Sequence, residues 1–251
     1  GYSSAASDVY KRQSRILLNF PSQAGHLWFM YPLISLYLFI PIISPWLSKA
    51  TKKEERFFIG LFLLSTCMPY LNRWCGEVWG QCFWNEYHML WYFSGYLGYL
   101  VLAHYIRVHL TWNRSKRLTV GGILMIIGAV WTIYSFYIQA VPGEILSTPV
   151  IEIGWAFCTI NCVLLTTGTF LIFTCINRPN PPRILTEASK LSYGMYLMHI
   201  FWLGLWVTVF KHTLALPTVA AIPCIAVSTF ICCFVTAKII SFIPGSKWII
   251  G

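Results

Sequence analysis

Charged residues are scarce in this chain, and acidic residues are the scarcest of them. Of its 251 residues only 10% are charged, with 8 Asp and Glu against 18 Lys and Arg, while 57% are hydrophobic and 17% aromatic. Because a water-soluble domain carries roughly 25% charged residues, the composition indicates a polytopic membrane protein. The net charge of +10 does not indicate a nucleic-acid partner, since the basic residues lie in short loops between apolar segments.

Several familiar catalytic patterns are missing as well. The sequence has no Walker loop, GxSxG elbow, HExxH helix or dinucleotide fingerprint. It has no CxxC or HxxxH pair, so we expect no metal site. No internal repeat is evident, which disfavours a transporter built from two symmetric halves. No cleavable signal pattern opens the chain, so the first membrane helix is expected to direct insertion.

Long apolar segments dominate what is present. Seven of them approach the ~20 residues that a helix needs to cross the hydrocarbon core of a bilayer. Helices are the only plausible spanning form for segments this long and this apolar. We therefore predict an all-α, polytopic transmembrane helix bundle with spans at residues 27–47, 57–71, 89–106, 118–140, 150–176, 191–210 and 218–243.

Basic residues are divided unevenly between the two alternating sets of loops. One set holds only Arg73 and Lys211. By the positive-inside rule the richer set, together with the C-terminus, is predicted to be cytoplasmic. Seven spans then place the N-terminus outside, which leads us to expect further spans upstream. The richer set comprises Lys49, Lys52, Lys53, Arg56, Arg107, Arg114, Lys116, Arg117, Arg178, Arg183, Lys190 and Lys247.

Two features outside the spans bear on organisation. Residues 1–13 (GYSSAASDVYKRQ) are small, polar and aperiodic, so we separate them as a non-native or disordered leader from a membrane domain at residues 14–251. A genuine disordered tail is the alternative. Cys75 and Cys82 share a Trp-rich outer loop, where a disulfide forms if the compartment is oxidising.

Residues 191–202 (LSYGMYLMHIFW) place proton-handling side chains inside an apolar span. Ser192, Tyr196 and His199 stand at i, i+4 and i+7, so they share one helix face, and Tyr193 stands next to them in sequence. An ionisable group at membrane depth is costly and usually faces a bundle interior or a wet cavity. This face is a candidate site, and an interhelical hydrogen bond from His199 is the equal alternative.

Four other candidate site residues are ionisable side chains at the ends of spans or in the loops between them. His26 opens the first span, where an imidazole suits general acid–base work, although an interfacial histidine among belt aromatics explains it too. Glu86 lies two residues before His88 and is able to orient that ring, or it is part of a solvated loop. Basic loops with Arg107 and Arg183 suit a phosphorylated donor such as coenzyme A, and the positive-inside bias explains them equally well.

Three stretches resemble the membrane acyltransferase family 3, whose members modify sugars of bacterial surface polysaccharides. They are HLWFMY at residues 26–31 with the apolar run to Pro41, YFSGYLGY at residues 92–99, and LSYGMYLMH at residues 191–199. The third matches the family's Ser-Tyr-Gly-hydrophobic-Tyr-Leu-hydrophobic-His pattern and is the most specific. The ending IPGSKWIIG is also similar, and the resemblance covers residues 19–251.

The resemblance implies an integral protein of the bacterial cytoplasmic membrane with about ten spans, so this chain is expected to lack the first three at its N-terminus. It implies transfer of an acetyl or other short acyl group from a cytoplasmic acyl-CoA to a sugar hydroxyl of a cell-surface glycan or lipid-linked sugar. No permanently bound cofactor is expected. The histidine that the family is regarded as using for catalysis would lie in the missing spans.

On this interpretation His26 and His199 have supporting catalytic roles, as a second proton handler or as a group that positions the acceptor. The residues predicted to bind substrate are Trp28, Glu86, Ser192, Tyr193 and Tyr196, with Trp28 and Tyr193 stacking on a sugar ring. Arg107 and Arg183 are predicted to bind the donor. The rival hypothesis is a non-enzymatic transporter or exporter subunit for a glycan or lipid.

Overall fold

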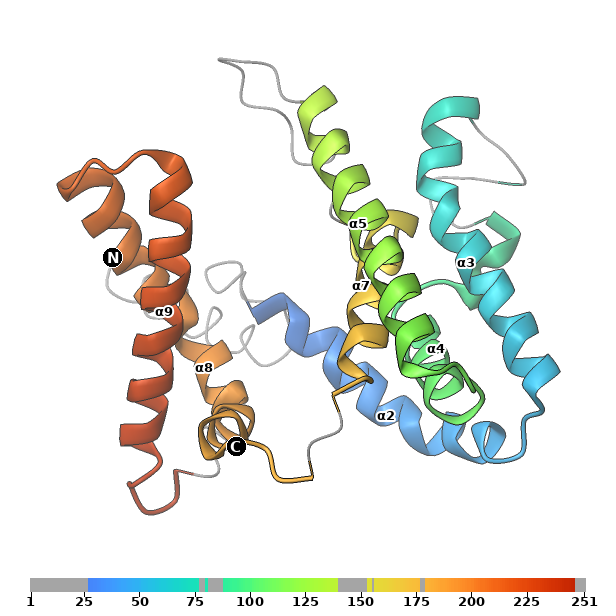
Figure 1. The fold of residues 1–251 in the computed structure, drawn as a ribbon, viewed down its shortest axis with the longest axis horizontal. Coiled ribbons are helices and arrows are strands. Elements are labelled where there is room, and N and C mark those ends of the chain that lie inside the picture. Colours follow the sequence, from blue (N-terminus) through green and yellow to red (C-terminus); the bar gives the residue numbers. More distant parts are fainter. Residues whose placement is uncertain are drawn as a thin grey trace, which may run out of the picture. The chain divides into compact units, whose positions relative to one another are not determined.

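The structure is a computed structural model that describes residues 27–76, 80, 88–139, 153–154, 156–176 and 179–246. Within these residues the secondary structure is helical and contains no strand, and an α-helix overlaps each of the seven predicted spans (Figure 1). The predicted helical membrane bundle is thereby confirmed. The α-helices are α2 (Met30–Leu47), α3 (Lys52–Cys75), α4 (Leu97–Val108), α5 (Arg114–Gln139), α7 (Ile160–Phe173), α8 (Arg183–Val207) and α9 (Thr218–Ile240).

In the part of the chain that the structure describes, four helical segments are long and apolar enough to cross a membrane: Leu27–Leu47, Arg114–Gln139, Arg183–Thr213 and Thr218–Ile240. The segment from Arg183 includes a π-helical turn, η3 (Thr208–Thr213), directly after α8. The helices α4 and α7 are apolar but shorter than predicted. The third predicted span divides into a 3-10 helix, η2 (His88–Phe93), and α4, because Gly95 between them has a φ of 87°, which ends regular helix.

Polar caps extend two helices beyond their apolar segments. The Glu54 side chain accepts the Thr51 N–H at 2.7 Å and the Thr51 hydroxyl accepts the Glu54 N–H at 3.4 Å, which is a capping box at the start of α3. Asn113 Oδ1 accepts the Lys116 N–H at 2.9 Å at the start of α5. Basic residues that the sequence assigns to loops therefore lie on the first turns of these two helices.

The chain divides into two compact units. Unit 1 contains residues 1–31 and 178–251, and unit 2 contains residues 32–177. In unit 1, α9 lies beside α8 (Figure 1), and the core between them is formed by Leu191, Met195, Cys233 and Ala237. Lys238 of α9 forms an ion pair with Glu187 near the start of α8. Within unit 1, α8 and α9 therefore form a helix pair with an apolar core along their contact and an ion pair at one end.

In unit 2, α5 and α7 approach each other through glycines. A Cβ added at Gly168 of α7 would lie 2.5 Å from both the Gly121 carbonyl oxygen and the Met125 backbone nitrogen of α5. A Cβ at Gly128 of α5 would lie 2.5 Å from the Leu165 nitrogen. Small residues allow helix backbones to pack this closely in membranes, so these glycines set the distance between the two helices.

A buried polar network joins three helices of unit 2. Asn161 of α7 is fully buried. Its Oδ1 accepts a hydrogen bond from the Tyr70 hydroxyl of α3 at 2.9 Å, and its Nδ2 donates to Thr132 Oγ1 of α5 and to the Gly154 carbonyl, both at 2.8 Å. Each polar atom of the Asn161 amide has a partner, as a buried polar group requires. This network accounts for the only strongly polar residue of α7.

Candidate functional site

The face of α8 that carries the sequence motif lines a pocket of about 450 Å³ between α8 and α9. Ser192, Tyr196 and His199 contribute from α8, as their spacing predicts. The other lining side chains are mainly apolar: Ala188, Met195 and Leu203 from α8, and Ala226, Thr229, Phe230 and Cys233 from α9. A small polar set on an apolar wall is typical of a ligand pocket.

The hydrogen bond of His199 determines which ring nitrogen can act as a base. Its Nδ1 lies 2.6 Å from the Tyr196 carbonyl oxygen. A carbonyl only accepts hydrogen bonds, so Nδ1 carries the proton and Nε2 is the proton-accepting nitrogen of the neutral ring. The ring also stacks on Tyr196, with centroids 5.5 Å apart and planes at 25°. The imidazole is thus held in one orientation and one tautomer.

A chain of aromatic rings connects the first residues of the first predicted span to this face. Tyr196 meets Phe29 edge to face at 6.2 Å, and Phe29 meets Trp28 at 5.7 Å. Trp28 is 38% exposed and Tyr193 is 39% exposed, and neither lines the pocket. The structure therefore joins Trp28 to the site through two rings, and it places Tyr193 outside the pocket that its neighbours share.

Thr229 of α9 is a member of this pocket that the sequence does not single out. Its side chain is 9% exposed, and its hydroxyl has no hydrogen-bond partner among the described residues. A buried polar atom without a partner costs about 1–3 kcal/mol, so a polar ligand atom in the pocket would be stabilised there. Because α9 is almost uniformly apolar, its sequence pattern gives no sign of this residue.

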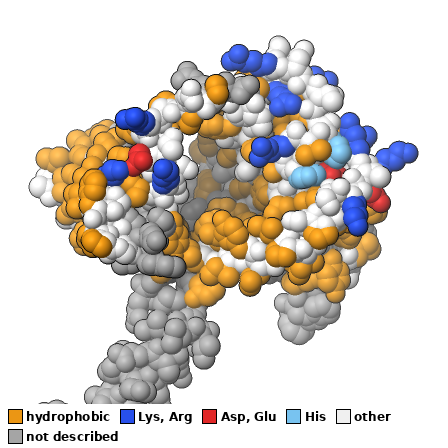
Figure 2. Space-filling model, turned by 90° about the horizontal axis from the view of Figure 1, so that it is seen from below, with side chains coloured by type: hydrophobic (Ala, Val, Ile, Leu, Met, Phe, Trp, Pro, Cys, Tyr) orange, Lys and Arg blue, Asp and Glu red, His pale blue; other side chains and the backbone are white. Residues whose placement is uncertain are grey.

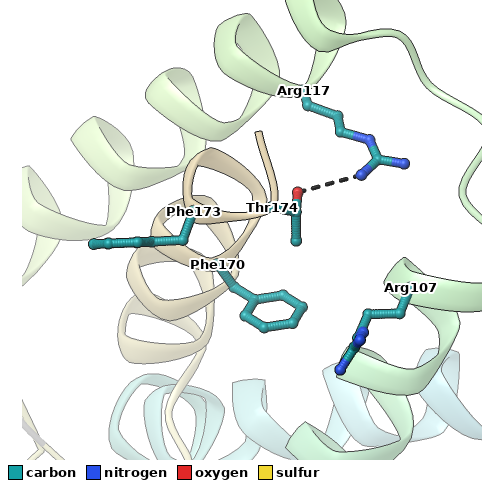
Figure 3. A pocket seen from close by; sticks show the side chains of 5 residues that line it. All are labelled: Arg107, Arg117, Phe170, Phe173 and Thr174. Atoms are coloured by element: carbon teal, nitrogen blue, oxygen red, sulfur yellow. Dashed lines mark hydrogen bonds between the residues drawn. The ribbon is translucent and has the colours of Figure 1, made fainter. Parts of the chain in front are cut away.

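A second pocket, of about 380 Å³, lies at one end of unit 2 (Figure 3). It is lined by Arg107 of α4, Arg117 of α5, and Phe170, Phe173 and Thr174 at the end of α7. Figure 3 shows the Arg117 guanidinium group beside Thr174 and the Arg107 guanidinium group beside the ring of Phe170, while the ring of Phe173 points away from both. Two cations and the phenyl ring of Phe170 suit a ligand that has both phosphate and an aromatic or apolar part.

Arg117 is held firmly in the wall of this pocket. Its Nε donates to the Trp112 carbonyl at 3.0 Å, its Nη2 to the Leu110 carbonyl at 2.8 Å, and its Nη1 to Thr174 Oγ1 at 3.4 Å. Three of its five N–H groups are used in this way, which leaves two for a ligand. The sequence predicts Arg107 as a donor-binding residue but does not select Arg117 from among the neighbouring basic residues.

The same end of unit 2 gathers most of its basic side chains. Figure 2 shows Lys and Arg side chains over this part of the molecule, close to histidine and acidic side chains. Lys52 Nζ donates to the His109 carbonyl at 3.3 Å, so the start of α3 meets the end of α4. Arg73 lies at the opposite end of α3. The charge asymmetry read from the sequence is therefore an asymmetry between the two ends of this unit.

A buried carboxylate lies within this basic end. Glu55 of α3 is fully buried, and its carboxylate lies 3.1 Å from His109 Nε2 and 3.2–3.3 Å from His104 Nδ1. Among the described residues no group of His, Cys, Asp or Glu is placed to hold a metal ion. The sequence does not single out Glu55, because its partners lie 49 and 54 positions away.

The remaining predicted site residues are not brought together by the structure. Arg183 is exposed on the first turn of α8 in unit 1 and does not line the pocket that contains Arg107. His26 and Glu86 lie outside the described residues, as do Cys82 and residues 1–13. Their roles stay predictions from the sequence.

Comparison with known proteins identifies one family. The model of acyltransferase family 3, described as an acyltransferase domain, matches residues 4–238, which is most of the chain. No curated protein and no solved structure matches.

Proposed function

This chain belongs to acyltransferase family 3, and we propose that it moves an acetyl or other short acyl group from a cytoplasmic acyl-CoA to a sugar hydroxyl of a cell-surface glycan. Its apolar helices and its family make it an integral membrane acyltransferase in general terms. The observation that carries the more specific proposal is the pocket of Arg107 and Arg117, since a coenzyme A donor presents phosphates and an adenine ring.

The donor is proposed to lie with its phosphates at the two guanidinium groups and its adenine against the phenyl ring of Phe170. Arginine binds phosphate with two parallel hydrogen bonds, and this pairing is roughly twice as strong as a neutral one. The pocket is at the basic end of unit 2, which the positive-inside rule assigns to the cytoplasm. Acyl-CoA is then taken from the compartment in which it is made.

The pocket between α8 and α9 is proposed to bind the acceptor hydroxyl. A sugar hydroxyl is a poor nucleophile near neutral pH, so a base must take its proton as its oxygen bonds to the thioester carbonyl carbon. The carbon–sulfur bond then breaks, and the coenzyme A thiolate receives a proton as it leaves. Nε2 of His199 suits a proton relay or a hydrogen bond to the acceptor, and Ser192, Tyr196 and Thr229 supply further polar contacts.

The rival hypothesis of a transporter or exporter subunit is less well supported. The family match is to an acyltransferase domain over residues 4–238. A transporter would use the same apolar helices, but it would not need a cationic and aromatic pocket specific for coenzyme A. Tight binding of coenzyme A is therefore the property that separates the two classes.

Replacing Arg107 with alanine is expected to weaken coenzyme A binding about tenfold to a hundredfold, because one charge-assisted contact to phosphate contributes about 1.5–3 kcal/mol. Binding is measured by calorimetry on the chain in nanodiscs of zwitterionic lipid. Arg114→Ala is the matched control: it removes the same charge from the same end, but Arg114 does not line the pocket. Binding of pantetheine, which lacks the phosphates and the adenine, should be unchanged in both variants.

Equal weakening by Arg114→Ala would show that only the general positive field matters and would contradict the proposed pocket. Failure of the wild-type chain to bind coenzyme A more tightly than pantetheine would contradict the proposed function. Repeating the titration in nanodiscs that contain anionic lipid tests whether the pocket binds the phosphate of a lipid headgroup instead of the phosphates of coenzyme A. If anionic lipid abolishes the effect of Arg107→Ala, the pocket binds a lipid headgroup and not the donor.

A further inference from the structure

Glu55 is the most deeply buried ionisable side chain at the basic end of unit 2, and the proposed transfer chemistry does not use it. A carboxylate that leaves water without partners loses a large solvation free energy. Glu55 has two partners, because His104 Nδ1 and His109 Nε2 lie within 3.1–3.3 Å of its oxygens. An ionised carboxylate only accepts hydrogen bonds, so both imidazoles donate to it.

The two histidines bracket Arg107 on the chain. His104 lies on α4 and His109 caps its end, with the His109 N–H donating to the Tyr105 carbonyl at 2.9 Å. Their rings approach each other, with centroids 6.3 Å apart and planes at 76°. One carboxylate on α3 therefore holds the last turn of α4 at two points, one before and one after Arg107.

Arg107 depends on this attachment more than Arg117 does. Arg117 is fixed by three hydrogen bonds of its own guanidinium group. Arg107 is exposed, and no hydrogen bond or ion pair of its side chain is present within the described part of the chain. The place from which its side chain reaches the pocket is therefore set by the backbone of the last turn of α4.

We infer that Glu55 is a positioning residue for the donor pocket: through His104 and His109 it fixes the end of α4 and so places Arg107 opposite Arg117. This inference rests on the proposed function, because the pocket is taken to bind the phosphates of coenzyme A. A binding group displaced by a fraction of an ångström loses much of its contribution, so supporting contacts of this kind have measurable effects.

The test compares two ligands that differ in the part that Arg107 contacts. Glu55→Ala is expected to weaken coenzyme A binding about tenfold and to leave pantetheine binding unchanged, measured by calorimetry on the chain in nanodiscs. Glu54→Ala is the matched control, since it removes an adjacent acid whose hydrogen bonds are to Thr51. Glu55→Gln should restore most of the affinity, because its amide can accept from one imidazole and donate to the other.

A double mutant separates positioning from a general loss of structure. In the Arg107→Ala background, Glu55→Ala should cause no further weakening, because the group that it positions is gone. Equal losses for coenzyme A and pantetheine, or additive losses in the double mutant, would overturn the inference while leaving the proposed donor site intact. If Glu55→Ala does not fold, His109→Asn is used in its place, because it removes only one of the two hydrogen bonds to Glu55. The same comparison of coenzyme A binding with pantetheine binding then applies.

The failure of the proposed function has a different signature. In that case the wild-type chain shows no preference for coenzyme A over pantetheine, and the inference about Glu55 fails with it. When the wild-type chain does prefer coenzyme A, the inference about Glu55 is tested separately, by the ratio of coenzyme A affinity to pantetheine affinity in the Glu55→Ala variant.

Discussion

Acyl transfer should fall about a hundredfold when His199 is replaced by alanine, since a positioned acid–base group contributes roughly 10²–10⁴ to the rate. His199 Nδ1 donates a hydrogen bond to the Tyr196 carbonyl at 2.6 Å, so Nε2 is the ring nitrogen that accepts a proton. The measurement is transfer of labelled acetyl from acetyl-CoA in membranes that contain the full-length protein, with protein levels matched between variants.

His212→Ala is the control for this experiment. It removes an exposed imidazole from η3, the π-helical turn that directly follows α8, and His212 does not line the pocket. Its turnover should equal that of the wild type. If the His199 variant also retains full turnover, the residue has no role in catalysis, and the hydrogen bond to Tyr196 is a structural feature of the helix.

Stability should respond most strongly at the contact between α5 and α7. Gly168→Ala adds a Cβ that would lie 2.5 Å from two backbone atoms of α5, the Gly121 oxygen and the Met125 nitrogen. Backbone cannot rotate aside as a side chain can, so the helices must separate, at a cost of about 3 kcal/mol. Thermal unfolding of the chain in detergent should therefore shift to a clearly lower temperature.

Gly122→Ala provides the same chemical change on α5 without the clash. Beyond the adjacent backbone of α5 itself, no atom lies within 4 Å of a Cβ at this position, and alanine is favoured over glycine in a helix by about 0.5–1 kcal/mol. This variant should unfold at an equal or slightly higher temperature. Equal destabilisation by the two substitutions would show that the glycines of this unit do not set the helix spacing.

Local sequence patterns predict the helices and one site face well. Apolar length predicts each helix, and the i, i+4, i+7 spacing places Ser192, Tyr196 and His199 in one pocket. Such patterns depend only on neighbours along one helix. Helix ends are less well predicted, because the cap of Thr51 with Glu54 extends α3 into a stretch that hydropathy assigns to a loop.

Contacts between helices account for what the sequence does not reveal. Glu55 and Arg117 acquire their significance from partners on other helices, and Thr229 acquires its significance from the pocket that α9 shares with α8. The two histidines beside Glu55 are about 50 positions away, and Thr174, which contacts Arg117, is 57 positions away. Hydropathy reports that a segment is apolar, but it does not report which segment lies next to it.

The amide of Asn161 has a consequence for how α7 enters the membrane. This helix has 14 residues and no charged side chain, so it is about 21 Å long, shorter than the ~30 Å hydrocarbon core. Apart from Asn161 and three threonines its side chains are apolar, so hydrophobicity alone does not select one depth or rotation in the bilayer. Bonds to Tyr70, Thr132 and Gly154 form together in only one of these arrangements, so this amide adds to the glycine contacts with α5 in selecting the depth and rotation of the helix.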